Sequence, residues 1–323
     1  MSGGTRRARA GTVVVITGAS SGIGRATARA YARAGARLVL AARSETALDT
    51  VAAECRELGA ETLVVPTDVS REGDVRALAA AAVGGFGRID VWVGNAGVFS
   101  YGSFEDTPSG VFRQVVETNL MGQVHGARAV LPYFRRQGSG ALILVGSLYS
   151  RVGSAVISPY VTSKFGLLGF AEALRQELRG TGIRLRLIVP ATIDTPIYQH
   201  AANVTLRHVH PLPPASSPQR VARAIVRAPH RRRYATFVGQ FQRSAVLLHR
   251  VSPRAYDAVA SFLVRRVELR GHGAEVTLGT VLESSGEAGA VTGGWRSGRP
   301  RVVVATVLSA VVAVTATSLR RRR

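Results

Sequence analysis

Short apolar runs alternate with longer stretches of helical periodicity through most of the first two hundred residues. The stretches with helical patterns lie at 23–34, 46–58, 71–83, 108–136 and 160–179, and the apolar runs lie at 13–17, 37–41, 62–66, 90–93, 141–146 and 184–189. Strands that are apolar throughout and separated by helices are typical of a parallel sheet buried on both faces. The pattern therefore predicts an α/β fold with a doubly wound parallel sheet flanked by helices.

The alternation weakens after Pro190, and the remaining chain reads as an extension. A loop rich in His, Pro and Ser is followed by two basic amphipathic patterns, at 218–228 and 253–270. The division that follows is an N-terminal tail at 1–11, the α/β domain at 12–240, a basic helical extension at 241–270, a Gly-rich linker at 271–300 and a C-terminal segment at 301–323.

The C-terminal segment carries 18 uncharged residues at 302–319, with four arginines after them. A bilayer-spanning helix needs about 20 apolar residues, and cationic residues often flank it. We therefore expect a membrane anchor here, with a transmembrane helix and a cytoplasmic catalytic domain. The alternative is a segment that packs on the domain.

Charge is unevenly distributed along a chain whose formal net charge is +22. Residues 1–198 carry +7, and residues 199–323 carry +15. The basic residues of the second part alternate with aliphatic faces rather than with stacking aromatic rings. An anionic membrane surface is therefore the expected partner, and nucleic acid is not. The single cysteine, Cys55, excludes an internal disulfide and fits a reducing compartment.

The sequence TGASSGIG at 17–24 follows the first predicted strand and opens the first predicted helix. Gly18, Gly22 and Gly24 allow a tight turn that brings the backbone close to a pyrophosphate at the helix N-terminus. After the second strand no acidic residue is available for a ribose hydroxyl, while Arg43 and Ser44 can hold a 2′-phosphate. NADP is therefore expected over NAD. The alternative for Arg43 is a solvated turn residue.

Lys164 is the only lysine among the 42 lysine and arginine residues, and it follows Tyr160 by four positions. On a helix both side chains leave the same face. An adjacent ammonium favours the phenolate and would lower the pKa of the tyrosine, which suits acid–base catalysis. Lysine is a compact point charge with a different donor geometry from arginine. A chance pair of tyrosine and lysine is the competing interpretation.

These motifs, in this order and spacing, resemble the short-chain dehydrogenase/reductase family over roughly residues 12–198. The matching positions are the Gly-rich turn, Asp68, Asn95 to Gly97, Asn119, Ser147, Tyr160 and Lys164. The resemblance implies a Rossmann-like fold and an NADP(H)-dependent oxidoreductase that interconverts a secondary alcohol and a ketone, or an alcohol and an aldehyde.

The same resemblance assigns roles. Tyr160 would be the general acid and base, Ser147 would orient the substrate oxygen, and Asn119 would hold a water in a proton relay. Lys164 would bind the nicotinamide ribose and lower the pKa of Tyr160, and Asp68 would contact the adenine. The implied cofactor-binding residues are Gly18, Ser20, Ser21, Gly22, Ile23, Gly24, Arg43, Asp68, Val69, Asn95, Ala96, Gly97, Tyr160, Lys164, Ile193 and Thr195.

Two positions depart from the family. Pro190 is followed by Ala191 where glycine is usual, and Ser21 stands where many NADP-using members carry a basic residue. Arg43 is therefore the main marker of cofactor selectivity.

The alternative function is a dinucleotide-binding regulator without significant turnover. A metal site is not expected, because His208 and His210 lack a completing cysteine or carboxylate nearby. The expected substrate is a small lipophilic alcohol or ketone, and assembly into a homo-oligomer is left open.

Overall fold

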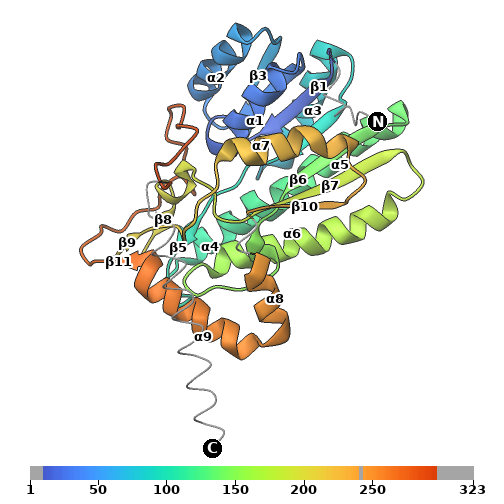
Figure 1. The fold of residues 1–323 in the computed structure, drawn as a ribbon. Helices are drawn as coiled ribbons and strands as arrows, with labels where there is room; N and C mark the ends of the chain where they lie inside the picture. The colour runs from blue at the N-terminus through green and yellow to red at the C-terminus, as the bar shows by residue number, and fades with distance from the viewer. Residues whose placement is uncertain (1–9, 240–242, 297–323) are drawn as a thin grey trace, which may run out of the picture.

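The structure is a computed structural model that describes residues 10–239 and 243–296. Its centre is a seven-stranded parallel sheet with the strand order β10-β7-β6-β4-β1-β2-β3 (Figure 1). The strands are β1 (Val13–Thr17), β2 (Arg37–Ala42), β3 (Thr62–Pro66), β4 (Val91–Gly94), β6 (Gly140–Val145), β7 (Ile183–Pro190) and β10 (Ala235–Val238). The predicted α/β, Rossmann-like fold is confirmed.

Two layers of helices cover the sheet, which explains why its strands are apolar on both faces. On one face lie α1 (Gly22–Ala32), α2 (Glu45–Glu57) and α7 (Pro218–Arg227). On the other lie α3 (Glu72–Phe86), α5 (Gly122–Gln137) and α6 (Ser158–Glu177), and α4 (Ser109–Val116) packs beside α6. The π-helical turn η1 (Glu117–Met121) joins α4 to α5.

The strand order reverses between β1 and β4, because the chain winds outward from β1 in both directions. In open parallel sheets, ligands bind outside the carboxyl ends of the strands at such a switch point. The Gly-rich turn follows β1, and Asn95 follows β4 directly. Topology alone thus places these two segments side by side at one edge of the sheet.

The second part of the chain builds over that edge. The extension includes α8 (Arg243–Val251), α9 (Pro253–Leu263) and the π-helical turn η5 (Val264–Glu268). Two small sheets pair β5 (Ser100–Tyr101) with β8 (Ala202–Asn203) and β9 (His208–Val209) with β11 (Leu269–Arg270). Short 3-10 turns lie in the connecting segments: η2 (Leu148–Ser150), η3 (Pro196–Tyr198) and η4 (Ala228–His230).

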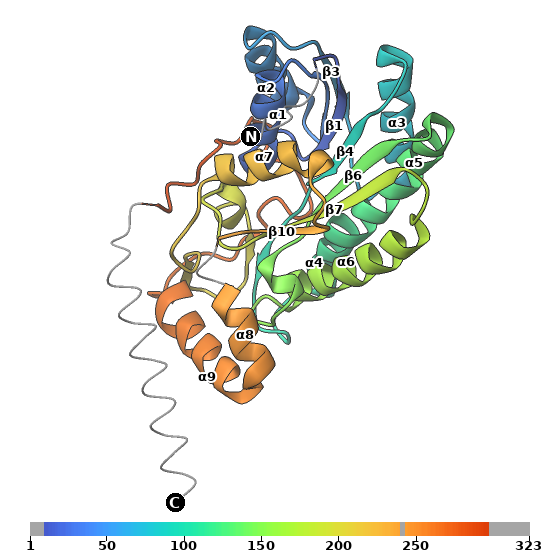
Figure 2. The same ribbon diagram turned by 45° about the vertical axis from the view of Figure 1, so that its right-hand side comes forward.

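The region expected to be a linker at 271–300 is not a free linker over its described part. Residues 277–295, which we call the strap, follow β11 in the chain and run past α1 and α7 (Figure 2). Backbone hydrogen bonds tie the strap to residues that precede it by more than 70 positions. A Gly-rich segment poor in apolar residues can be held this way because its main-chain groups make most of its hydrogen bonds to the domain.

The assignment of the chain to a membrane requires correction. Within residues 10–239 and 243–296, no helix has both the length and the apolar character that crossing a bilayer demands. The anchor predicted at 301–323 lies outside the described residues.

Candidate active site

The Gly-rich turn is closed so tightly that two of its glycines cannot be replaced without displacing backbone. Gly18 has a φ of +65°, and a Cβ on it would lie 2.8 Å from the Cα of Ala96. A Cβ on Gly24 would lie 1.9 Å from the carbonyl oxygen of Gly18. The turn therefore keeps the N-terminus of α1 close to β1, where main-chain N–H groups favour a phosphate.

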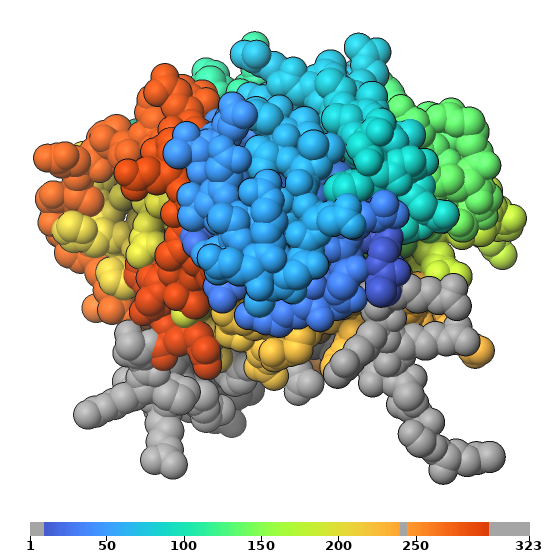
Figure 3. All heavy atoms as spheres, turned by 90° about the horizontal axis from the view of Figure 1, so that it is seen from above, coloured from blue at the N-terminus to red at the C-terminus, as the bar shows by residue number. Residues whose placement is uncertain are grey.

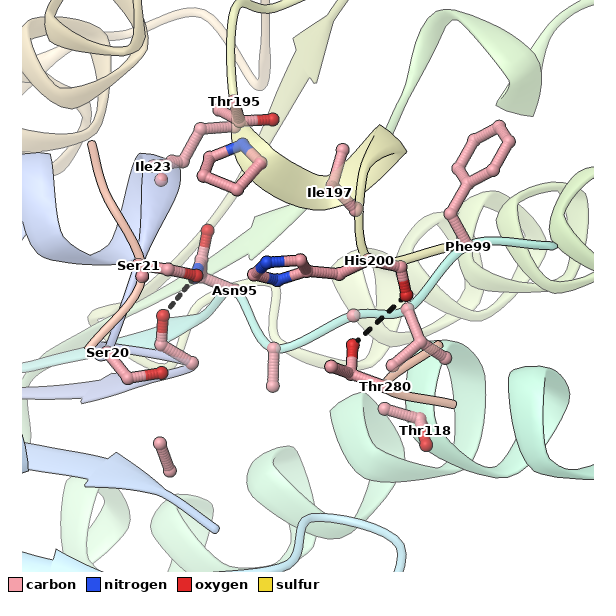
Figure 4. A pocket seen from close by; sticks show the side chains of 18 of the residues that line it. Ser20, Ser21, Ile23, Asn95, Phe99, Thr118, Thr195, Ile197, His200 and Thr280 are labelled. Carbon is pink, nitrogen blue, oxygen red and sulfur yellow. Dashed lines mark hydrogen bonds between the residues drawn. The ribbon is translucent and has the colours of Figure 1, made fainter. Parts of the chain in front are cut away.

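Asn95 fixes this turn from the neighbouring strand. Its Nδ2 donates to the carbonyl oxygens of Thr17 at 3.0 Å and Gly18 at 3.2 Å. The Thr17 hydroxyl in turn accepts from the N–H groups of Asn95 and Ala96. Figure 4 shows Asn95 at the wall of a cavity, close to Ser20 and Ser21. The Asn95 amide group therefore fixes the shape of the turn, and its Nδ2 is occupied by these hydrogen bonds.

Arg43 and Asp68 follow β2 and β3, at the same end of the sheet as the turn. The Asp68 carboxylate accepts from the N–H and the hydroxyl of Ser70. Burial lowers the pKa of Arg43, and the charge of Asp68 acts in the opposite direction. The guanidinium donates to backbone carbonyls within residues 280–283 of the strap.

Tyr160, Lys164 and Ser147 meet below the carboxyl ends of the central strands. Tyr160 and Lys164 lie one turn apart near the start of α6, and Ser147 caps the turn η2. Their exposed fractions are 9%, 4% and 6%, and the phenol is hydrogen-bonded to Ser147. The Lys164 Nζ donates to the carbonyl oxygen of Val145 at 3.1 Å and lies 5.5 Å from the centre of the Tyr160 ring. The structure thus brings all three predicted groups together.

The protonation of these groups differs from the expectation. Burial raises the pKa of Tyr160 to about 12, and the hydrogen bond with Ser147 acts in the opposite direction. Burial lowers the pKa of Lys164 to about 8. The expected lowering of the Tyr160 pKa by Lys164 is not found, because loss of solvation is the dominant effect at the phenol and the ammonium donates to Val145. At neutral pH the phenol is protonated and can donate a proton.

Asn119 lies in the π-helical turn η1 and is completely buried. Its Oδ1 accepts from the N–H of Val98 at 2.7 Å, and its Nδ2 donates to the Val98 carbonyl oxygen at 2.9 Å and to the Ser163 hydroxyl at 3.2 Å. The side chain therefore connects the segment after β4 to α6, the helix that carries Tyr160. The water expected in a proton relay at Asn119 stays a prediction.

One cavity collects nearly the whole set of predicted cofactor residues. It has a volume of about 220 Å³. Gly24 is the exception, because it lies behind the turn, where the carbonyl group of Gly18 faces it. The predicted residues that line this cavity are Gly18, Ser20, Ser21, Gly22, Ile23, Arg43, Asp68, Val69, Asn95, Ala96, Gly97, Tyr160, Lys164, Ile193 and Thr195.

A second cavity of about 280 Å³ lies on the other side of Tyr160, and Ser147 also lines it. Its remaining walls come from η2, α8, α9 and the loop before α7, and they are mainly apolar. They include Leu148, Val152, Leu212, Leu248, Val259, Leu263 and Val267. Four residues border both cavities: Phe99, Tyr160, Ala191 and Tyr198. The Tyr160 side chain thus lies between a polar cleft and an apolar pocket.

Several residues at this junction carry no motif that the sequence could reveal. The Phe99 ring lies 4.3 Å from that of Tyr160, centre to centre, and Tyr149 meets the same ring edge-on at 6.3 Å. Glu268 is 3% exposed, and its Oε2 has no hydrogen-bond partner within the described part of the chain. Burial raises the pKa of Glu268 to about 8. Only the position of Phe99 just after Asn95 to Gly97 offered a signal.

The strap is the other element that the sequence did not reveal. Thr280, Ser284, Ser285, Glu287 and Gly289 line the first cavity together with the Gly-rich turn. Figure 4 shows Thr280 beside His200, whose carbonyl oxygen accepts a hydrogen bond from the Thr280 hydroxyl at 3.3 Å. A tryptophan in an otherwise Gly-rich stretch, Trp295, was the one hint that this stretch packs against the domain.

Comparison with known sequences identifies similar proteins over most of the chain. The family described as short chain dehydrogenase matches residues 12–204. An uncharacterized oxidoreductase of Bacillus subtilis is 38% identical, over 76% of this chain and 70% of its own length. A ketoacyl reductase of Nostoc is 33% identical over 68% of this chain and 75% of its own. An 11-beta-hydroxysteroid dehydrogenase of Sesamum indicum is 39% identical over 59% of this chain and 55% of its own length.

Solved structures give the same picture. A short chain dehydrogenase/reductase from Burkholderia phymatum, in complex with NAD, superimposes with a TM-score of 0.69 and 27% identity, covering 83% of this chain and 99% of that one. An alcohol dehydrogenase from the archaeon Thermococcus sibiricus, complexed with 5-hydroxy-NADP, gives a TM-score of 0.63 and 28% identity, with coverages of 70% and 95%.

Proposed function

Since the chain belongs to the short-chain dehydrogenase family and is an oxidoreductase of that family, we propose that it uses NADP(H) to interconvert a lipophilic secondary alcohol and its ketone. The observation that carries this proposal is the position of Tyr160. Its phenol, hydrogen-bonded to Ser147, separates a cleft lined by the Gly-rich turn from an apolar pocket. A hydride donor and a carbonyl compound would meet at this partition.

The polar cleft fits a dinucleotide. Gly18 and Gly24 keep side chains out of the turn, so no side chain of the turn itself would stand between the N-terminus of α1 and a pyrophosphate. Asp68, Ile193, Thr195 and Lys164 all line this cleft; Asp68 would contact the adenine, and Ile193 and Thr195 would face the nicotinamide. When bound, the cofactor supplies or accepts the hydride, and the protein supplies position and electrostatics.

The proton moves through the protein's own side chains. In the direction of reduction, the neutral Tyr160 phenol donates its proton to the substrate oxygen, while the Ser147 hydroxyl holds that oxygen in place. The buried Lys164 lies one helical turn away, where its ammonium can bind the ribose and stabilise the phenolate as it forms. Asn119 keeps the segment after β4 in register with α6, and so fixes Tyr160 against Phe99.

The preference for NADP rests on Arg43. No acidic side chain follows β2 at 41–44, and a guanidinium with a neighbouring hydroxyl, Ser44, suits a 2′-phosphate. Among the structural neighbours, the Thermococcus sibiricus enzyme holds an NADP derivative and the Burkholderia phymatum protein holds NAD. Both dinucleotides therefore fit this fold, and the basic residue after β2 favours the phosphorylated one.

The substrate class follows from the apolar pocket. Aliphatic side chains of α8 and α9 form much of its wall, and the catalytic hydroxyls are the main polar groups at its inner end. Such a pocket favours a ketone or alcohol with an apolar body. Two relatives, named as a ketoacyl reductase and an 11-beta-hydroxysteroid dehydrogenase, carry names that refer to compounds with an apolar body, which supports this substrate class.

The proposal is tested by incubating the purified protein with NADPH and a panel of aliphatic, alicyclic and steroid ketones, and following NADPH absorbance. We expect turnover with apolar ketones, faster with NADPH than with NADH at equal concentration. Tyr160→Phe should retain NADPH binding and lose at least a hundredfold in kcat, because it lacks the proton donor. Binding of NADPH without turnover of any ketone would favour the alternative of a dinucleotide-binding regulator.

The role of the pocket is tested by filling it. Val259→Phe adds a ring to the α9 wall and leaves less room for the body of a large substrate. We therefore expect it to lower kcat/KM for the bulkiest accepted ketone by about tenfold or more, which corresponds to a loss of about 1.4 kcal/mol in transition-state binding. The smallest accepted ketone should be affected little. Val276→Phe, at a position that is 58% exposed, is the matched control. Equal losses for large and small ketones would contradict the assignment of the pocket.

A further inference from the structure

We propose that the strap is an internal competitor of the cofactor. It occupies the donors that the phosphates of NADP(H) need, so the chain inhibits itself until the cofactor displaces the strap. This inference rests on the proposed NADP(H) site, and it adds regulation to that site. Figure 3 shows atoms from the C-terminal end of the described chain packed against those of the first sixty residues.

The strap is anchored at its beginning. Thr277 and Asn203 exchange backbone hydrogen bonds at 2.7 and 3.0 Å, and the Thr280 N–H donates to the His200 carbonyl oxygen at 2.8 Å. Val281 is completely buried against Val98 and Ala202. These contacts fix the point at which the strap enters the cleft, and they involve none of the phosphate donors.

The next residues engage Arg43 and Ser44. The Arg43 guanidinium donates to the carbonyl oxygens of Thr280 at 2.6 Å, Leu282 at 3.1 Å and Glu283 at 3.1 Å. The Ser44 hydroxyl donates to the carbonyl oxygen of Gly286 at 2.6 Å. Both donors proposed for the 2′-phosphate are therefore bound to carbonyl oxygens of the strap.

Further along, the strap reaches the Gly-rich turn. The Gly22 N–H, at the N-terminus of α1, donates to the Ala290 carbonyl oxygen at 3.1 Å, and the Arg25 Nη1 donates to that of Gly289 at 2.9 Å. A Cβ on Gly289 would lie 2.8 Å from the Cβ of Ser21. The strap thus sits directly on the position where a helix N-terminus would attract the pyrophosphate.

The far end of the strap is held beside the nicotinamide residues. The Asp194 carboxylate accepts from the N–H groups of Gly293 at 3.0 Å and Trp295 at 2.8 Å, and the Trp295 Nε1 donates to the Thr195 carbonyl oxygen at 3.0 Å. Asp194 itself is 3% exposed. The strap therefore crosses the whole cleft, from the adenosine side to the nicotinamide side.

Charge gives the strap the character of an anionic ligand. The strap contains two glutamates, Glu283 and Glu287, and no arginine or lysine, in a chain whose formal net charge is +22. Glu287 lines the cofactor cavity. Like charges repel, so a carboxylate here opposes a phosphate as long as the strap stays in place.

The cofactor can displace the strap because Arg43 and the other N–H donors bind a phosphate more strongly than they bind the carbonyl oxygens of the strap. Hydrogen bonds from a guanidinium to a phosphate are charge-assisted on both sides, and they are stronger than those to a neutral carbonyl. The strap compensates by being tethered. A cofactor with both a pyrophosphate and a 2′-phosphate can therefore replace it, and one without the 2′-phosphate leaves the Arg43 contacts of the strap intact.

The first test displaces the strap sterically. Gly289→Val introduces a side chain that must push the strap away from Ser21, while Thr292→Val changes an exposed side chain of the same segment and is the control. We expect Gly289→Val to lower the Kd for NADPH about tenfold, mainly through a higher association rate in stopped-flow fluorescence. The control should match the wild type.

Two results would overturn the inference. If Gly289→Val binds NADPH no better than the control, the strap does not compete. If it binds NADPH more weakly, the strap clasps the cofactor instead. Because a valine at 289 could disturb Ser21 directly, Trp295→Ala is the second variant; it loosens the strap from Thr195 without touching the Gly-rich turn, and the same gain in affinity is expected.

The second test reports on the strap itself. The chain has two tryptophans, and Trp92 is 1% exposed in the core, so a change in emission reports on Trp295. We expect 2′,5′-ADP, which carries phosphates and no nicotinamide, to shift Trp295 emission to the red and to increase acrylamide quenching. Adenosine at the same concentration should do neither. An unchanged Trp295 at saturating 2′,5′-ADP would show that phosphate and strap bind together.

The two proposals fail in different ways. Unaltered NADPH affinity in the strap variants, with ketone reduction intact, removes the competition and leaves the oxidoreductase. Improved NADPH affinity in those variants, without turnover of any ketone, leaves the competition and removes the proposed reaction. Failure of the wild type and of both strap variants to bind NADPH would remove both.

Discussion

For Lys164, the sequence predicted the position on the helix but not the protonation of the side chain. The composition identified it as the one lysine, and its spacing from Tyr160 predicted a shared helix face, which α6 provides. Its protonation depended on burial, which the sequence does not encode locally. An ammonium that is 4% exposed, with a single carbonyl partner at Val145, has a lowered pKa of about 8.

Substitutions at Lys164 should separate its charge from its packing. Lys164→Arg is expected to reduce kcat/KM by at least a hundredfold, because a planar guanidinium does not fit a site shaped for an ammonium. Near-normal activity would contradict the role assigned to this lysine. Steady-state kinetics with NADPH and an accepted ketone provide the measurement.

Lys164→Met should also be inactive, yet more stable than the wild type at pH 7 by roughly 1–2 kcal/mol. The lowered pKa means that the folded protein carries the cost of a buried charge below pH 8, and that this cost fades as the pH rises toward 10.5. The gain measured by thermal unfolding should therefore shrink between pH 8 and pH 10. A gain that does not change with pH would indicate packing alone.

Glu268 is the opposite case, a buried carboxyl that no motif announces. Its pKa is raised to about 8 by burial, so the folded protein binds the proton more tightly than the unfolded chain does. The stability contributed by this group is complete below about pH 4.5 and is lost as the pH rises to 8. Residue-level chemistry of this kind appears only once three-dimensional burial is known.

Glu268→Gln should remove that dependence. We expect the variant to be more stable than the wild type at pH 8, by on the order of 2 kcal/mol, and the difference to decrease toward pH 5. Urea unfolding at several pH values measures it. Glu275→Gln, at an exposed position, serves as the control and should follow the wild type throughout. A constant difference between Glu268→Gln and the wild type would contradict the buried-carboxyl interpretation.

At the scale of elements, the Gly-rich turn was the most predictable part of the site. The run TGASSGIG after an apolar strand sufficed to place a strand, a turn and a helix, and the structure has them as β1 and α1. The sequence could not show that Asn95, from β4, ties the turn down. That contact depends on the sheet order, which brings together residues that lie 78 positions apart.

Two glycine-to-alanine changes should give opposite results. Gly24→Ala places a methyl group against the Gly18 carbonyl, so we expect a loss of NADPH binding and a lower melting temperature. Gly84→Ala, in the interior of α3 with nothing within 4 Å of the added atom, should stabilise the protein by about 0.5–1 kcal/mol and leave NADPH binding unchanged. Differential scanning fluorimetry with and without NADPH distinguishes them.

For the whole molecule, the strands and helices with a periodic apolar pattern could be predicted from the sequence. A segment that is held in place only by tertiary hydrogen bonds could not. Six of the seven strands, and the helices between them, follow from alternating apolar runs; β10 lies beyond the last of these runs. The strap looked like a linker because glycine and polar residues predict no secondary structure, yet Arg43 and Asp194 hold it through its backbone. Apolar composition suggested a bilayer-spanning helix, and none is present in residues 10–239 and 243–296.

Cofactor binding should be visible in the stability of the whole chain. A ligand at one hundred times its Kd raises the free energy of unfolding by about 2.7 kcal/mol, since it binds the folded state alone. At equal concentrations NADPH should therefore raise the melting temperature more than NADH does. In Arg43→Ala the two dinucleotides should give equal shifts. A larger shift with NADH in the wild type would contradict the proposed role of Arg43.

Val281 fastens the strap to the protein body immediately before the residues that enter the cleft. A segment tethered so closely acts at an effective concentration in the millimolar range, whatever the amount of protein in the cell. Its opposition to the cofactor therefore cannot be diluted away or titrated out. The chain would respond to the concentration of phosphorylated dinucleotide alone. The concentration needed to displace the strap would be set by the tether and would not depend on the concentration of the protein.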